Sequence, residues 1–288
     1  MIMIDNLTYG YSKQQTLLEN ITLKLEPGSV YGLLGKNGVG KSTLLHLMAG
    51  LLNPNKGEAN WKGNNVFDRK VETLSQIYMV PEEFELPNLS GAKFLDQYAP
   101  FYPCFDFDNF MANLEGFDLQ MPKNLKKQSM GEKKKFLISF AIATRCAVIL
   151  MDEPTNGLDI PAKSAFRKMV ASSVTEKSLF VISTHQVRDL EQVIDHVLIL
   201  DSKKVIFNHS IFTIQDQLSV WKQDGDFKGD SFYQTKTMGS SFNLIPKITS
   251  TSESDTIDFE FLFNAVMANP TVINNHLKTP STHGNTME

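Results

Sequence analysis

Short apolar runs alternate along the chain with stretches in which apolar residues recur at helical spacing. Runs rich in β-branched and aliphatic residues predict strands over residues 2–7, 21–25, 30–34, 77–80, 148–151, 179–183 and 197–200. The runs that begin at Val30, Val148 and Leu179 are apolar on both faces, which is typical of central parallel strands covered by helices on each side. The pattern therefore predicts an α/β fold, with residues 2–25 forming an antiparallel edge region.

Two later segments depart from this alternation. Between residues 81 and 128 aromatic side chains are frequent and no run has a convincing strand pattern, so we interpret residues 84–135 as an inserted α-helical subdomain. After Trp221, Gln, Asp, Gly, Ser and Thr become frequent before a last amphipathic run over 257–269. These shifts predict a main domain over 1–222, a small C-terminal extension over 223–269 and a disordered tail over 270–288.

Composition and charge exclude several classes of protein. The 288 residues are 42% hydrophobic and 21% charged, which is near the average for globular proteins. The net charge of -4 supplies no general attraction to DNA or anionic lipid, so no nucleic-acid partner is expected. Cys104 and Cys146 lie far apart and indicate neither a disulfide framework nor a zinc site.

No segment of the sequence predicts a membrane span or a leader. The first ten residues have neither a basic region nor a continuous apolar region. The most apolar stretch, residues 136–154, is interrupted by Arg145 and is shorter than the roughly 20 residues that a spanning helix needs. We expect a cytoplasmic protein, and any work at a membrane would need a separate membrane partner.

The segment GKNGVGKST, residues 35–43, predicts a phosphate-binding loop. It follows the apolar run 30–34, precedes a helical pattern and fits G-x-x-x-x-G-K-[ST], which indicates a P-loop NTPase core. Backbone N–H groups and the helix start would hold phosphates, Lys41 would reach the β- and γ-phosphates, and Ser42 would ligate Mg²⁺. A glycine-rich turn without a ligand is the alternative, but chance occurrence of the pattern is on the order of one in a hundred. The candidate nucleotide-binding residues are Gly35, Asn37, Gly38, Gly40, Lys41, Ser42 and Thr43.

A second motif follows the apolar run 148–151, which ends in Asp152 and Glu153. Carboxylates at the end of a buried strand are costly, and a nearby Mg²⁺ would compensate them. Asp152 is a candidate Mg²⁺ ligand, and Glu153 is a candidate general base for an attacking water. Asp-Glu-Pro could instead be a turn that ends the strand. Downstream of a phosphate loop, the catalytic interpretation is favoured.

Residues 1–208 resemble the nucleotide-binding subunits of ATP-binding cassette (ABC) transporters. The elements of that family occur in its order: an aromatic residue before the core (Tyr11), the phosphate loop, YMVPE ending at Glu82, a signature segment QSMGEKKK (128–135), the metal strand, NGLD (156–159) and STH ending at His185. Taken singly, Tyr11 could be an ordinary strand residue and His185 a structural histidine.

The resemblance implies a role for each of these elements. Tyr11 would stack on adenine, and His185 would hydrogen-bond the γ-phosphate and the region of Glu153. Two subunits would pack head to tail, with Ser129 and Gly131 of the signature segment facing the ATP of the other subunit. Asp159 would work across the same interface.

Two departures from the family pattern stand out. The signature segment usually reads LSGGQ, and here only Ser129 and Gly131 are kept. Ser129 and Glu132 also form the sequence of a capping box, which is an alternative or additional role. Glu82 replaces the usual glutamine as a candidate metal ligand, and we expect this third carboxylate to tighten metal binding or to raise the pKa of a neighbouring carboxyl.

The resemblance implies an ATP-hydrolysing motor subunit that couples to a separate permease from the inner face of the cell membrane. Its partners would be a transmembrane permease and a second copy of itself or a homologous ATPase. The aromatic segment 101–119 and the run 259–266 are similar to the branch that serves ABC-2-type permeases, although the phenylalanines could simply be subdomain core. The alternative function is a soluble ABC-type ATPase acting on nucleic acid or the ribosome, but such chains usually carry two cassettes or a long coiled coil. A small-molecule kinase would need neither the signature segment nor STH.

Overall fold

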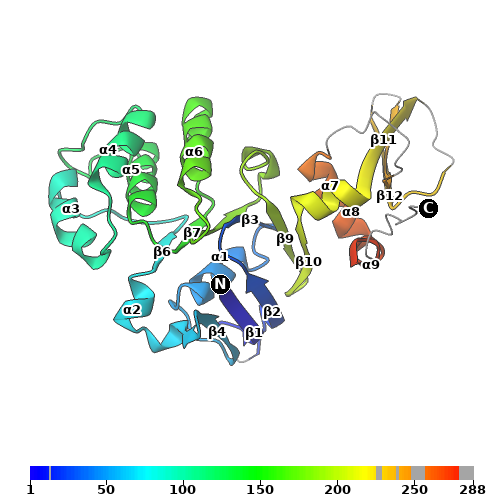
Figure 1. Cartoon of the computed structure of the whole chain (residues 1–288), viewed down its shortest axis with the longest axis horizontal. Coiled ribbons are helices and arrows are strands. Elements are labelled where there is room, and N and C mark those ends of the chain that lie inside the picture. The colour runs from blue at the N-terminus through cyan, green and yellow to red at the C-terminus, as the bar shows by residue number, and fades with distance from the viewer. Residues whose placement is uncertain (13, 225–228, 238–239, 248–256, 279–288) are drawn as a thin grey trace, which may run out of the picture.

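The computed structural model describes residues 1–12, 14–224, 229–237, 240–247 and 257–278. A six-stranded sheet forms the centre of the molecule, in the order β10-β9-β3-β8-β7-β6 (Figure 1). Its strands are β3 (Ser29–Leu34), β6 (Ile77–Val80), β7 (Val148–Asp152), β8 (Leu179–Thr184), β9 (His196–Asp201) and β10 (Lys204–Ser210). All neighbours pair in parallel except β10, which is antiparallel to β9. The prediction of a central parallel sheet is confirmed.

An antiparallel sheet covers one face of the central sheet, in the order β2-β1-β4-β5. It consists of β1 (Ile2–Tyr9), β2 (Leu18–Leu25), β4 (Lys56–Trp61) and β5 (Asn64–Asn65). The pairing of β1 with β2 confirms the predicted antiparallel region. The short elements η1 (Val66–Asp68) and α2 (Val71–Leu74) lead from this sheet to β6.

The central sheet separates two hydrophobic cores. Along β7 the side chains of Val148 and Leu150 join the core under the antiparallel sheet, which also includes α1 (Lys41–Met48). The alternate residues Ile149 and Met151 join the other core, with α5 (Met130–Ala143) and α6 (Ile160–Ser173). Because both faces are covered, β7 is buried at every position.

The helical subdomain lies at one end of the molecule (Figure 1). It consists of α3 (Gly91–Tyr98), η2 (Ala99–Phe101), α4 (Phe107–Gly116) and the start of α5. Residues 81–128, all of which the structure describes, contain no strand. Phe94 and Phe110 pack edge to face on Phe136, so these phenylalanines form the core of the subdomain.

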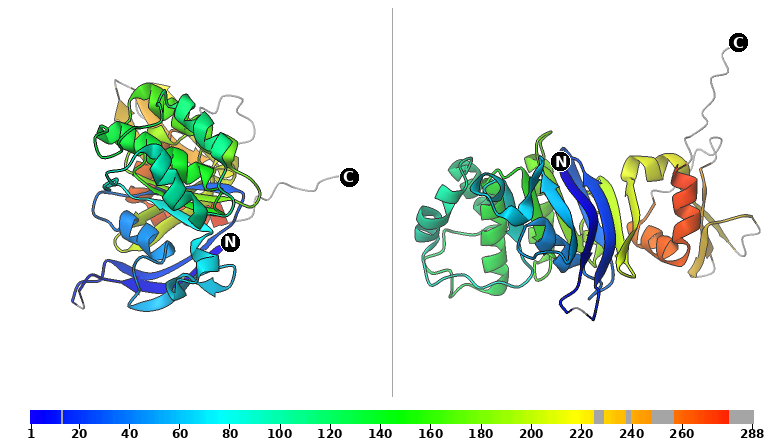
Figure 2. Two further views of the ribbon diagram at one scale, coloured as in Figure 1. Left: turned by 90° about the vertical axis from the view of Figure 1, so that its left-hand side faces the viewer. Right: turned by 90° about the horizontal axis from the view of Figure 1, so that it is seen from below.

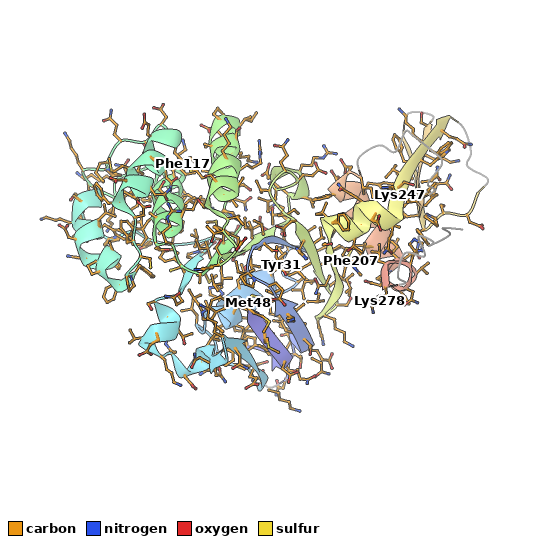
Figure 3. The ribbon with its side chains drawn as sticks, viewed as in Figure 1. Tyr31, Met48, Phe117, Phe207, Lys247 and Lys278 are labelled. Atoms are coloured by element: carbon orange, nitrogen blue, oxygen red, sulfur yellow. The ribbon has the colours of Figure 1, made fainter. Side chains whose placement is uncertain are left out.

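The C-terminal extension lies at the opposite end. It contains α7 (Ile211–Gln217), a three-stranded sheet in the order β11-β13-β12, and the helices α8 (Phe259–Ala268) and α9 (Pro270–Lys278). The strands are β11 (Leu218–Asp224), β12 (Tyr233–Thr237) and β13 (Ser240–Pro246). Seen from below, the antiparallel sheet of the main domain lies between the helical subdomain and this extension (Figure 2). Buried Phe207 of β10 lies where the central sheet meets the extension (Figure 3).

The extension differs from the sequence prediction in two respects. The predicted boundary between 222 and 223 falls inside β11, so the structural unit begins earlier. Disorder from residue 270 onward is wrong for Pro270–Lys278, which form α9. This helix buries Ile273 and Leu277, one helical turn apart, against the rest of the extension, and its other positions are polar enough to resemble a tail. Residues 279–288 lie outside the described residues.

Candidate active site

The phosphate-binding loop connects the end of β3 at Leu34 with the start of α1 at Lys41. A side chain at Gly35 would place its Cβ 2.6 Å from the backbone oxygen of Leu200 in the neighbouring strand. Gly40 caps the N-terminus of α1 with φ 112°, in the left-handed region that favours glycine. The glycines therefore let the loop approach β9 and turn abruptly into the helix, which points the first amides of α1 toward the cavity described below.

Lys41 is buried inside this loop. Its Nζ donates to the backbone oxygens of Gly35, at 2.9 Å, and Lys36, at 3.3 Å. The same Nζ lies 3.7 Å from Oε1 of Glu153, and both side chains are almost fully buried. The ammonium is thus held in the centre of the loop, where an entering phosphate would meet it.

Glu153 occupies a strained turn directly after β7. Its φ of 44° is unusual for a residue other than glycine, and such conformations occur mostly at functional sites. Its Oε1 lies 2.9 Å from Nδ1 of His185, whereas its Oε2 is buried without a hydrogen-bond partner among the described residues. A buried carboxylate oxygen without a hydrogen-bond partner lowers the stability of the folded chain, so it indicates a role other than stabilising the fold. This geometry suits a base that accepts a proton from a water.

Asp152 precedes Glu153 at the end of β7 and is also buried. Its Oδ1 accepts a hydrogen bond from the hydroxyl of Ser183 on β8. Ser42 and Glu82 line the cavity, and Glu82 is exposed and accepts from Nδ2 of Asn156 at 3.1 Å. Carboxylate and hydroxyl oxygens are donors that suit Mg²⁺. The described residues contain no cluster of three or more His, Cys, Asp or Glu side chains that could hold a metal ion.

The loop, Glu82 and Glu153 border a common cavity of about 370 Å³, whereas the predicted site residues Gly35 and Asp152 are not among its lining residues. Its lining residues are Tyr11, Leu17, Asn37, Gly38, Gly40, Lys41, Ser42, Thr43, Glu82, Glu153 and His185. The structure thus brings together most of the residues predicted from the sequence, and it adds Leu17. Tyr11 is 70% exposed at the rim, where its hydroxyl lies 3.1 Å from Oγ1 of Thr43.

Ser129, Gly131 and Asp159 are not among the residues that line this cavity. Ser129 caps α5: its Oγ accepts from the Glu132 amide, and its own amide donates to Glu132 at 2.8 Å, which confirms the capping box. Asp159 caps α6 by accepting from the Ala162 amide at 2.8 Å. Ser129 and Asp159 are exposed, so this chain's own cavity is built without them.

Lys134 is a site residue that the sequence interpretation missed. Its side chain is buried, and its Nζ donates to the backbone oxygens of Glu153 and Asn156, both at 3.1 Å. It therefore ties α5 to the turn that carries Glu153. Burial lowers the pKa of the Lys134 ammonium below its ordinary value, against the opposing effect of the nearby carboxylates. The signal in the sequence is its spacing from the buried Ile138, one turn along the same helix face.

Replacing Lys134 with methionine is expected to lower the free energy of unfolding by about 1–3 kcal/mol, because a buried carbonyl oxygen and a partly buried one lose their donor. Urea denaturation measures this change. Lys133→Met removes a less buried neighbour in the same run and serves as the control. A Lys134→Met protein as stable as Lys133→Met would contradict the structural role.

The contribution of Lys134 to stability should also depend on pH. Because folding lowers its pKa, there is an interval below 10.5 in which the unfolded chain holds this proton and the folded chain has released it. In that interval the Lys134 amine makes the free energy of unfolding increase as the pH rises. The difference between wild type and Lys134→Met should therefore increase from neutral to alkaline pH in urea denaturation. A constant difference would contradict the burial of the ammonium.

Within the described ranges, none of the helices has the length and apolar character needed to cross a membrane.

Known proteins similar to this chain are ATP-binding proteins of ABC transporters. A family model described as "ABC transporter" matches residues 18–156. The chain is 30% identical over 213 residues to the bacitracin transport ATP-binding protein BcrA of Bacillus licheniformis, covering 72% of this chain and 68% of that protein. It is 27% identical over 207 residues to the lantibiotic transport ATP-binding protein SrtF of Streptococcus pyogenes, covering 72% and 89%.

Solved structures share the fold. An ATP-binding subunit of an ABC transporter is similar with a TM-score of 0.69 and 25% identity, over 75% of this chain and 92% of that chain. A dimeric ATP-binding cassette in a post-hydrolysis state, bound to ADP and phosphate, is similar with a TM-score of 0.64 and 20% identity, over 73% and 98%. The predicted α/β fold with a P-loop NTPase core is confirmed.

Proposed function

Because the chain belongs to the ATP-binding proteins of ABC transporters, a family of ATPases, we propose that it is the motor subunit of a membrane transporter. In this proposal two copies, or this chain and a homologue, enclose two molecules of ATP head to tail. Their association and release drive a separate permease from the cytoplasmic face of the membrane.

The residues of the cavity divide the work of hydrolysis. The loop amides and Lys41 would bind the phosphates, and Tyr11 at the rim would stack on adenine. Glu153 would accept a proton from the attacking water through its unpartnered oxygen, while His185 holds the other oxygen and reaches the γ-phosphate. Ser42, Asp152 and Glu82 would hold Mg²⁺, which supplies charge neutralisation at the phosphates when bound.

The observation that supports a head-to-tail pair is the division of the predicted site residues. Phosphate loop, base and histidine border one cavity, whereas Ser129 and Asp159 are exposed outside it. Gly131 is the second residue of α5, and the amides at a helix N-terminus would suit a phosphate of a second subunit. The same capping bonds that hold Ser129 in one chain would then open or rearrange when ATP is enclosed.

The proposed association with a permease is tested by isolating the full chain from detergent-solubilised membranes of its own host and identifying the proteins bound to it. A multi-span membrane protein in a fixed ratio to the chain is the expected companion, and the resemblance of segments 101–119 and 259–266 to the branch that serves ABC-2-type permeases leads us to propose a permease of that type. Nuclease-sensitive nucleic acid in place of a membrane protein would favour the alternative of a soluble ATPase acting on nucleic acid.

Glu82→Gln tests whether this carboxylate faces the metal. Removing a unit charge about 4 Å away in water is worth roughly 1 kcal/mol, so the Mg²⁺ concentration for half-maximal turnover should rise a few-fold. Turnover at saturating Mg²⁺ should persist, because the family normally has glutamine here. The matched control is Glu83→Gln, an exposed carboxyl next in sequence that does not line the cavity. Equal Mg²⁺ dependence in the two variants would show that Glu82 points away from the metal.

A further inference from the structure

The segment that follows His185 is held from two sides. It contains η3 (Val187–Asp189) and connects β8 to β9. On one side is α6, whose Lys163 pairs with Asp189 at 2.6 Å. On the other side is α8 of the C-terminal extension. The histidine that contacts Glu153 is therefore adjacent to a segment that the extension touches.

Two polar contacts join this segment to α8. Oε1 of Glu191 accepts from the backbone amide of Phe259, the first residue of α8, at 2.9 Å. Arg188 pairs with Glu260 at 2.9 Å. The helix N-terminus thus receives a carboxylate from the histidine segment in addition to its own cap, Asp258.

Apolar packing supports the same contact. Val187 and Leu190 of the segment are buried in one continuous core with Phe259 and Leu262 of α8. A displacement of α8 therefore cannot leave the segment unchanged, because buried side chains on both sides are closely packed. Figure 1 shows the extension beside β9 and β10, at one edge of the central sheet.

We propose that the C-terminal extension positions His185 for hydrolysis, with Glu191 and Arg188 as the positioning residues that connect α8 to the histidine segment. Contact between α8 and η3 keeps Nδ1 of His185 against Oε1 of Glu153. The proposal rests on the proposed role of His185 in hydrolysis. It gives the extension a function within the same chain, so that a shift of α8 changes turnover and leaves the phosphate loop intact.

If these contacts only stabilised the fold, their loss would lower the unfolding midpoint without a separate effect on kcat. Arg188 and Glu260 are 71% and 54% exposed, and exposed ion pairs contribute little to stability. Loss of this pair should therefore leave the unfolding midpoint nearly unchanged, and any fall in turnover must come from the position of the segment.

The first test compares Glu191→Ala with Glu191→Gln in the full chain. Glutamine keeps an oxygen that can accept from the Phe259 amide, and alanine does not. Small displacements of a catalytic group can cost up to about 10²-fold in rate, so kcat of Glu191→Ala should fall at least about fivefold. KM for ATP and binding of a fluorescent ATP analogue should stay near wild type, and Glu191→Gln should retain most of kcat. Lys247→Ala is the control, because Lys247 donates to the Gln215 backbone inside the extension, away from η3.

The second test exchanges the charges of the exposed pair. Arg188→Glu and Glu260→Arg should each reduce kcat, and the double variant should recover it, because the pair is restored with opposite direction. If the loss of kcat in the double variant equalled the sum of the losses in the two single variants, the proposal would be overturned.

His185→Ala, measured in parallel, distinguishes the role of His185 in hydrolysis from the positioning role of Glu191. Full turnover in His185→Ala would show that the proposed role of this histidine is wrong. Loss of turnover in His185→Ala, together with unchanged kcat in Glu191→Ala, would overturn the positioning role alone. The positioning role would also be overturned if Glu191→Ala had a higher KM for ATP and a lower unfolding midpoint than wild type, and if Glu191→Gln showed the same changes.

Discussion

Replacing Glu153 with glutamine is expected to reduce ATP turnover by about 10²- to 10⁴-fold, the range typical of general-base catalysis. The amide keeps the size of the side chain and an oxygen that His185 can approach, but it cannot take a proton from water. ATP binding should persist, because the loop and Lys41 are unchanged. Phosphate release under single-turnover conditions measures the chemical step directly.

Glu83→Gln is the matched control for this variant, since it removes an exposed carboxylate outside the cavity. It should turn over ATP as fast as wild type. Comparable activity in Glu153→Gln and Glu83→Gln would mean that another group activates the water.

Lys41→Ala is expected to abolish detectable hydrolysis and to weaken ATP binding strongly. Lys41 is a buried cation inside the phosphate loop, and removing one positioned electrostatic contact costs about 10²- to 10³-fold in catalysis. The variant also deprives the buried carboxylate of Glu153 of the ammonium 3.7 Å away. Titration with a fluorescent ATP analogue measures binding independently of turnover.

Lys36→Ala provides the comparison, because Lys36 lies in the same loop but its side chain is exposed and does not line the cavity. We expect near-normal binding in Lys36→Ala. If Lys41→Ala bound and hydrolysed ATP as well as Lys36→Ala, the interpretation of the phosphate loop would be wrong.

Strands with continuous apolar character could be predicted from the sequence, whereas strands with few buried positions could not. β7 is buried throughout and was predicted nearly to its ends. β4 has the sequence KGEANW and buries only Ala59 and Trp61, so its pattern is too weak to distinguish from a loop. The polar strands β11 to β13 and the helix α9 depend in the same way on contacts within the extension.

The candidate site shows a similar division. Lys41 and Glu153 stand in motifs whose chemistry is readable from spacing, and the structure places them 3.7 Å apart. Lys134 was overlooked because a run of three lysines resembles a solvated helix face, and only the fold shows which of the three turns inward. Asp159 caps α6 within this chain, and its predicted role across a subunit interface rests on the family resemblance alone.

The most direct test of the account is the molar mass of Glu153→Gln in solution, measured by size-exclusion chromatography with light scattering. With saturating MgATP we expect twice the mass of the chain, because hydrolysis cannot release the pair. Without nucleotide the mass should be that of one chain. A single-chain mass under conditions where bound ATP is demonstrated would contradict the head-to-tail dimer.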